Sequence, residues 1–236
     1  MSPIKTVLVA VDFGEASARA VGLAGVIAST FGARLLAVHA ERFDPPPYFT
    51  LEQVARLEAE RRAAEAAAAA HLVQFALNQT AYPVTPLIAD EPPVDAILHA
   101  AADAELIVIG THGRRGPGRW WLGSVAERVV RAAPMPVLVT RASTSARDVF
   151  ERIVIVGDDA SRAVAARTMA DQLAGAFNGK VIDAGPLAHC QPDQMAQASL
   201  VVMETSGGHP AWAMSDSVAK VLGACQRPVL FIPKAK

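Results

Sequence analysis

Short apolar segments rich in branched side chains recur along the chain and predict the strands of a parallel sheet. They occupy residues 6–11, 34–40, 84–89, 106–109 and 137–140. Because these runs are almost continuously apolar, they are typical of strands that are buried on both faces. Pro86 interrupts the third run and cannot donate a ladder hydrogen bond, so we expect that strand to lie near an edge of the sheet.

Segments with helical periodicity separate these strands. Helices are expected from Ser17 to Gly32, over 51–79, over 93–102, and from Gly123 or Ser124 to Arg131. Ser17 is a favourable capping residue and Gly32 a favourable stop, whereas the consecutive prolines within residues 42–50 predict a surface loop. The alternation of strands and helices predicts an α/β domain over residues 1–142, with an open parallel five-stranded sheet and helices on both faces.

A shorter version of the same pattern follows the polar residues 143–149. Strands are expected at 153–156, 181–183, 200–203 and 229–232, with helices over 160–177 and 215–222. A third strand and most of two helices have no counterpart in this second unit. We therefore predict a degenerate, truncated copy over residues 150–236, and we expect it to pack against the first unit because so small a sheet buries too little surface alone.

Composition narrows the classes of function. The 236 residues are 52% hydrophobic, and 22 Lys and Arg stand against 23 Asp and Glu. Without an excess of basic charge, nucleic acid and membrane surfaces are disfavoured as partners. The two cysteines and the lack of a signal-peptide pattern lead us to expect a soluble protein of the cytoplasm.

Glycines after the fourth predicted strand indicate an anion-binding loop. Gly110 and Gly113 permit close approach of a ligand, while Gly123 and Ser124 place free N–H groups at the start of a helix. A helix N-terminus attracts phosphate, and ligands of parallel sheets bind at the carboxyl ends of strands. A flexible connection without a ligand is the alternative. The arginines at 114, 115 and 119 fit either interpretation.

The spacing G-x2-G-x9-G-S, from Gly110 to Ser124, resembles the nucleotide-binding signature of the universal stress protein family. Residues 3–141 are similar to that family in element order, in the Val11-Asp12 end of the first strand and in the Val38-His39 end of the second. The resemblance implies an ATP-binding fold related to the adenine-nucleotide alpha hydrolases, a role in stress survival, and dimerisation that often uses the last strand.

Carried over to this sequence, the resemblance assigns nucleotide contacts to seven residues. They are Asp12, Val38, Gly110, Gly113, Gly123, Ser124 and Val125. Asp12 would face the adenosine, although it could instead cap the following helix. The Val38 backbone would meet the adenine and Gly110 the ribose, and the other residues would surround the phosphates. The sequence shows no metal-ligand spacing, so Mg²⁺ would be held mainly by the phosphates.

Several residues near the loop depart from the family pattern. Phe13 follows Asp12 and would border the pocket, and Trp120 with Trp121 suggests packing against another half or chain more than base stacking. His39 is expected to be a core histidine with an internal partner.

The second copy departs further from the pattern. It aligns Glu204 with Gly110, Gly207 with Gly113, and Asp216 with Gly123. Carboxylates there would repel phosphate, so we expect this half not to bind ATP.

The leading hypothesis is therefore a stress-response protein whose first half binds ATP as a regulatory or interaction module. It would act as a homo-oligomer or through pairing of its own halves. A dimerisation or interaction protein that needs no nucleotide is one alternative. A slow ATP-hydrolysing enzyme is another, although no catalytic residues are assigned, because no nucleophile with a neighbouring base and no GK[ST] loop occurs in the sequence.

Overall fold

The computed structural model describes residues 3–41, 51–111, 122–141, 144–146, 148–156, 164–185, 197–205 and 227–233. The strands of the first half are β1 (Thr6–Ala10), β2 (Arg34–Ala40), β3 (Val84–Ala89), β4 (Leu106–Thr111) and β5 (Val137–Arg141). Its helices are α1 (Glu15–Phe31), α2 (Leu51–Leu77), α3 (Pro93–Ala100) and α4 (Ser124–Ala132). The predicted bounds of β2 and β3 are confirmed. The loop expected at 42–50 lies outside the described residues.

The predicted start of α1 at Ser17 is wrong. Its N-cap is Gly14, which is extended with ψ 169°, and the Ser17 hydroxyl donates to the Gly14 carbonyl at 2.9 Å from inside the first turn. Gly32 ends the helix in the left-handed conformation, with φ 63°. The C-terminal signal is therefore confirmed, because glycine adopts this conformation without the steric cost that a side chain incurs.

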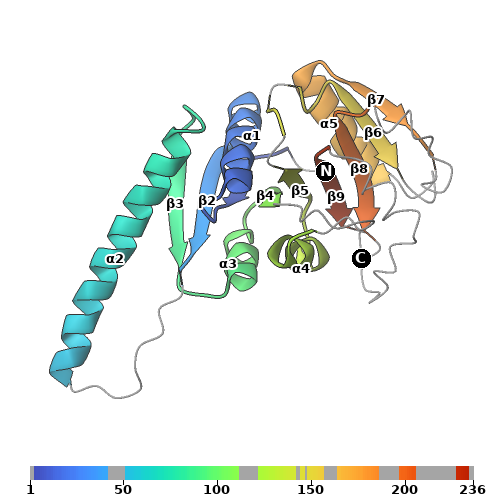
Figure 1. Ribbon diagram of the computed structural model, residues 1–236. Helices are drawn as coiled ribbons and strands as arrows, with labels where there is room; N and C mark the ends of the chain where they lie inside the picture. The colour runs from blue at the N-terminus through green and yellow to red at the C-terminus, as the bar shows by residue number, and fades with distance from the viewer. Residues whose placement is uncertain are drawn as a thin grey trace.

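The second half contributes β6 (Arg152–Val156), α5 (Val164–Phe177), β7 (Lys180–Asp183), β8 (Leu200–Thr205) and β9 (Val229–Pro233). The helix expected at 215–222 lies outside the described residues. All the described strands form one nine-stranded sheet in the order β3-β2-β1-β4-β5-β9-β8-β6-β7 (Figure 1). β3 lies at one end of this sheet, which confirms the edge position predicted from Pro86.

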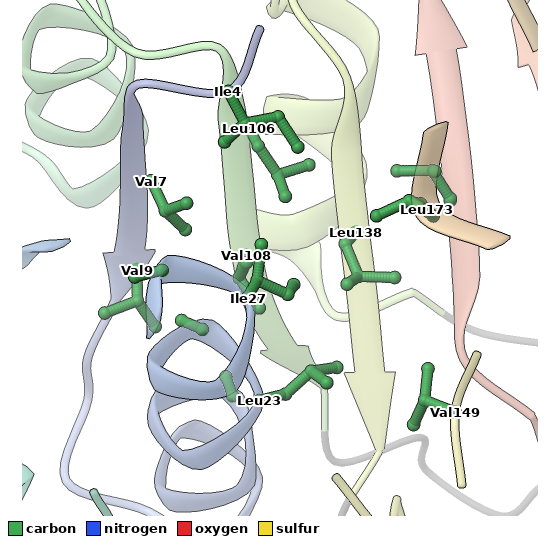
Figure 2. Packing of buried hydrophobic residues seen from close by; sticks show 14 of the residues in the cluster. Ile4, Val7, Val9, Leu23, Ile27, Leu106, Val108, Leu138, Val149 and Leu173 are labelled. Carbon is green, nitrogen blue, oxygen red and sulfur yellow. The ribbon is translucent and has the colours of Figure 1, made fainter. Parts of the chain in front are cut away.

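Alternate strand residues face opposite sides of the sheet and build two apolar clusters. One contains Val7, Val9 and Val108, and it is covered by α1, α5 and the C-terminal part of α2. Figure 2 shows Leu23 and Ile27 of α1 lying over this face. The other cluster is covered by α3 and α4. Burial on both faces explains why the strand segments read as continuous apolar runs rather than as alternating ones.

The two halves join where β5 pairs with β9, the one antiparallel pair among the described strands. Leu138 lies opposite Leu230, while Val137 faces Phe231 and Val139 faces Val229. When β9 is aligned with β5, Val229 corresponds to Val137 and Phe231 to Val139. The pairs Val137–Phe231 and Val139–Val229 are then related by a two-fold rotation about the central pair Leu138–Leu230. The junction thus has the self-complementary register of a two-fold interface, but within one chain.

The strand order of the second half follows that of the first. Going outward from the junction, β9-β8-β6-β7 corresponds to β5-β4-β1-β2, and the described residues of the second half contain no strand that corresponds to β3. The registers agree as well, because Glu204 pairs with Ile232 where Gly110 pairs with Thr140. That the second half is a degenerate repeat of the first stays a prediction.

Candidate functional site

The candidate site lies at the carboxyl ends of β1 and β4. These neighbouring strands mark the point where the strand order reverses, since β1 leads outward to β2 and β3 whereas β4 leads to β5. The helix after β1 covers one face of the sheet, and the helix after β4 covers the other. Such a switch point leaves a crevice beyond the strand ends, where ligands of open α/β sheets bind.

Gly110 has a packing role at the end of β4. A Cβ at this position would lie 2.4 Å from the carbonyl carbon and oxygen of Ala16 and 2.7 Å from the Ser17 nitrogen. Only glycine therefore lets the first turn of α1 lie against β4. The family resemblance implies that this glycine lies beside the ribose of a nucleotide. The packing of α1 gives a second, independent reason for a glycine at this position.

Gly123 is different, because neither its conformation nor its described surroundings require glycine. Its φ of −55° and ψ of 152° suit any residue, and among the residues that the structure describes a Cβ would meet only the Thr111 hydroxyl at 3.6 Å, an ordinary contact distance. The residue is exposed, as is Ser124. A ligand that approaches this backbone closely would account for the missing side chain.

The first turn of α4 carries backbone N–H groups without helical partners. The first helical hydrogen bond runs from Glu127 N–H to the Gly123 carbonyl at 2.9 Å, and no side chain caps the helix among the described residues. The amides of Ser124 and Val125 precede that bond and have no acceptor within the helix. Together with the helix dipole, they form a site suited to an anion.

Thr111 orients this helix and was not identified from the sequence. Its buried hydroxyl accepts a hydrogen bond from Gly123 N–H at 3.1 Å. The last residue of β4 therefore holds the N-cap of α4 across the intervening loop. In the sequence, the position of a threonine immediately after Gly110 is the one feature that indicates this hydrogen bond to the start of α4.

Asp12 projects from the end of β1 and is exposed. Its Oδ1 accepts a hydrogen bond from Gly14 N–H at 2.9 Å. This bond lies in the turn before α1, whose N-cap Gly14 has no side-chain cap, so the alternative role of Asp12 as a helix cap is wrong. The carboxylate has a second oxygen, which leaves it able to accept a ligand hydroxyl as well.

The Val38 backbone is engaged inside the sheet. Val38 is 2% exposed, and its carbonyl accepts a hydrogen bond from Val11 N–H at 2.9 Å. Along a strand, backbone groups point alternately to the two neighbours, so those of Ala40 also face β1. Because β1 ends at Ala10, Ala40 N–H finds no strand partner there, and the described residues show no hydrogen bond from it to the Val11 carbonyl.

An aromatic cluster borders this end of β2. Phe13 has a left-handed φ of 60°. Its ring centroid lies 4.5 Å from that of His39, 4.4 Å from that of His71 and 5.3 Å from that of Phe75. The Phe13 ring thus packs toward α2. His39 has the internal partner that the sequence predicted, since its Nδ1 lies 2.8 Å from the Val11 carbonyl oxygen.

Other predicted features lie outside the described residues. These are Gly113, the arginines at 114, 115 and 119, Trp120, Trp121, Gly207 and Asp216. Within the described part of the chain, no group of three or more His, Cys, Asp or Glu is placed to hold a metal ion. No helix in that part is long and apolar enough to cross a membrane.

Residues 3–141 match the model of the universal stress protein family. A universal stress protein from Thermus aquaticus is 39% identical over 140 residues, which cover 58% of this chain and 98% of that protein. One from Mycobacterium tuberculosis is 32% identical over 147 residues, covering 60% of this chain and 43% of that protein. The crystal structure of a universal stress protein from Archaeoglobus fulgidus covers 98% of both chains, with a TM-score of 0.71 and 14% identity, and so shares the fold.

Proposed function

Because the chain belongs to the universal stress protein family, we propose that its first half binds an adenine nucleotide, ATP, in the crevice between β1 and β4. The observation that carries this proposal is the start of α4. There an exposed glycine, for which the described residues give no packing or conformational reason, precedes amides that have no helical acceptor.

The phosphates would lie at this helix start. The amides of Ser124 and Val125 would donate to phosphate oxygens, and the Ser124 hydroxyl adds one more donor. A side chain on Gly123 would stand between the phosphates and these amides. Gly113 belongs to the same proposed phosphate loop through its place in the motif.

The adenosine would lie toward β1 and β2. We transfer the expected backbone contact from Val38 to Ala40, because the Val38 carbonyl already accepts from Val11 N–H. Ala40 offers an N–H and a carbonyl on the side facing β1, which match the ring-nitrogen acceptor and amino donor of adenine. Asp12 would accept a ribose hydroxyl with the oxygen that Gly14 does not use, and Gly110 would lie beside the ribose.

A divalent ion such as Mg²⁺ would neutralise phosphate charge and be held mainly by the phosphates. This expectation rests on the lack of a clustered ligand set among the described residues. The protein would serve as a regulatory or interaction module in a stress response, with the nucleotide as its ligand.

We propose that the second half does not bind ATP. Glu204 occupies in β8 the register position that Gly110 occupies in β4. A carboxylate at that point would repel phosphate, and its side chain would fill the space that the first turn of α1 takes in the first half.

Isothermal titration of the full chain with ATP and Mg²⁺ tests the proposal. The expected result is one site per chain, with binding lost in Gly123→Val, whose thermal unfolding should match that of the unaltered protein. Absence of heat at high protein concentration would favour the nucleotide-independent interaction protein. Product analysis after long incubation should recover intact ATP, whereas steady release of ADP would favour the slow enzyme.

A further inference from the structure

His39 holds a backbone carbonyl that would otherwise continue the sheet. Its Nδ1 lies 2.8 Å from the Val11 carbonyl oxygen. A carbonyl can only accept, so Nδ1 carries the proton and donates it. In the regular parallel pattern set by Val11 N–H and the Val38 carbonyl, the next hydrogen bond would join Ala40 N–H to this same oxygen.

We propose that His39 is a positioning residue for base recognition, which ends the β1–β2 ladder so that Ala40 N–H stays free to bind the nucleotide base. The imidazole takes the acceptor that would have drawn Ala40 into the sheet. This inference rests on the proposed nucleotide site, but it concerns an arrangement that exists without the nucleotide.

Phe13 keeps the imidazole in place. The left-handed turn at Phe13 directs the chain away from β2 directly after Asp12. The Phe13 ring contacts two histidine rings, tilted by 52° to His39 and stacked at 24° on His71. Ring contacts of this kind contribute modest but specific stabilisation, so the cluster fixes the orientation in which Nδ1 reaches Val11.

The second half provides an internal contrast. Ala184 N–H donates to the Ile155 carbonyl at 3.0 Å. When the strand pair β6–β7 is aligned with β1–β2 by register, Ala184 corresponds to Val38. The next residue, Gly185, therefore stands at the position of His39 and has no side chain to hold a carbonyl. The half that is expected not to bind ATP thus lacks the imidazole.

Two substitutions of His39 test its hydrogen-bond donor and its aromatic ring separately. His39→Phe keeps an aromatic ring against Phe13 and removes the donor, whereas His39→Asn restores a donor near the position of Nδ1 and removes the ring. His71→Ala is the matched control, because it removes the opposite ring contact of Phe13 without touching Val11.

The first readout is the ratio of affinities for ATP and inosine triphosphate, measured by titration. Inosine reverses the donor and acceptor of the adenine edge, so the unaltered protein should prefer ATP by about 10- to 100-fold. His39→Phe should bring this preference to within about twofold of unity, while His39→Asn and His71→Ala should keep most of it. An undiminished preference in His39→Phe overturns the inference.

The second readout needs no nucleotide. Amide hydrogen exchange of Ala40 in the free protein should be fast in the unaltered chain and in His39→Asn, and at least about tenfold slower in His39→Phe, where Ala40 N–H gains the Val11 carbonyl. Equal exchange rates in all three would overturn the inference even if ATP binds. If no nucleotide binds but the exchange rates differ as stated, the proposed function fails and the role of His39 in ending the ladder stands.

Discussion

Gly110 and Gly123 belong to one motif, yet the structure predicts opposite consequences for the same substitution. In Gly110→Ala the new Cβ would lie 2.4 Å from the Ala16 backbone, where ordinary contacts begin at 3.4 Å. The first turn of α1 must therefore move by about 1 Å. In Gly123→Ala the nearest atom among the described residues is the Thr111 hydroxyl oxygen at 3.6 Å, so none of these residues needs to move.

The expected changes in stability differ in size. Overpacking of this kind costs about 1–3 kcal/mol, and α1 cannot easily yield because Ala16 and Ser17 are buried. At about 2–4 °C per kcal/mol for a chain of this size, Gly110→Ala should lower Tm by about 2–12 °C. Gly123→Ala has allowed dihedral angles, and the gain of up to about 1 kcal/mol through the unfolded chain is opposed by the similar preference of an N-cap for glycine over alanine, so its stability should change by less than about 1 kcal/mol.

Thermal and urea unfolding of both variants without nucleotide measures these differences in stability. Titration with ATP measures the effect of each substitution on nucleotide affinity. Gly123→Ala should weaken ATP binding at least tenfold while its Tm changes by less than about 4 °C. A loss of stability in Gly123→Ala equal to that in Gly110→Ala would refute the reasoning, because both glycines would then serve packing. Unchanged stability in Gly110→Ala would refute the packing role of that residue.

Three further changes test other parts of the structure. Asp12→Ala removes the acceptor for Gly14 N–H and should lower the free energy of unfolding, measured in urea, by about 0.5–1.5 kcal/mol. Asp12→Asn keeps an acceptor oxygen and should retain the stability of the unaltered protein. Equal losses of stability in the two variants would contradict this role of Asp12. Ser124→Glu should stabilise α4 by about 0.3–1 kcal/mol through the helix dipole yet abolish ATP binding, so retained affinity would contradict the phosphate site. Leu138→Ala at the β5–β9 junction should cost about 2–5 kcal/mol, since Leu138 is 1% exposed, whereas Leu77→Ala, 54% exposed, should cost little. A small loss in Leu138→Ala would indicate that the junction contributes little to folding.

Much of the fold was readable from the sequence because its signals are local. Apolar runs bounded by turn residues fixed β2 and β3 to the residue, and Gly32 marked the end of α1. The glycine spacing that leads into α4 identified the family for the same reason. A strand end and a helix start are properties of neighbouring residues, so they leave a pattern in the chain.

The meaning of individual site residues depended instead on contacts between distant segments. The packing role of Gly110 comes from α1, and the availability of Ala40 rather than Val38 comes from where β1 ends relative to β2. The hydroxyl of Thr111 acts only because α4 returns to it. The register of strands and the approach of helices are set by the packing of the whole sheet, and no local pattern of residues encodes them.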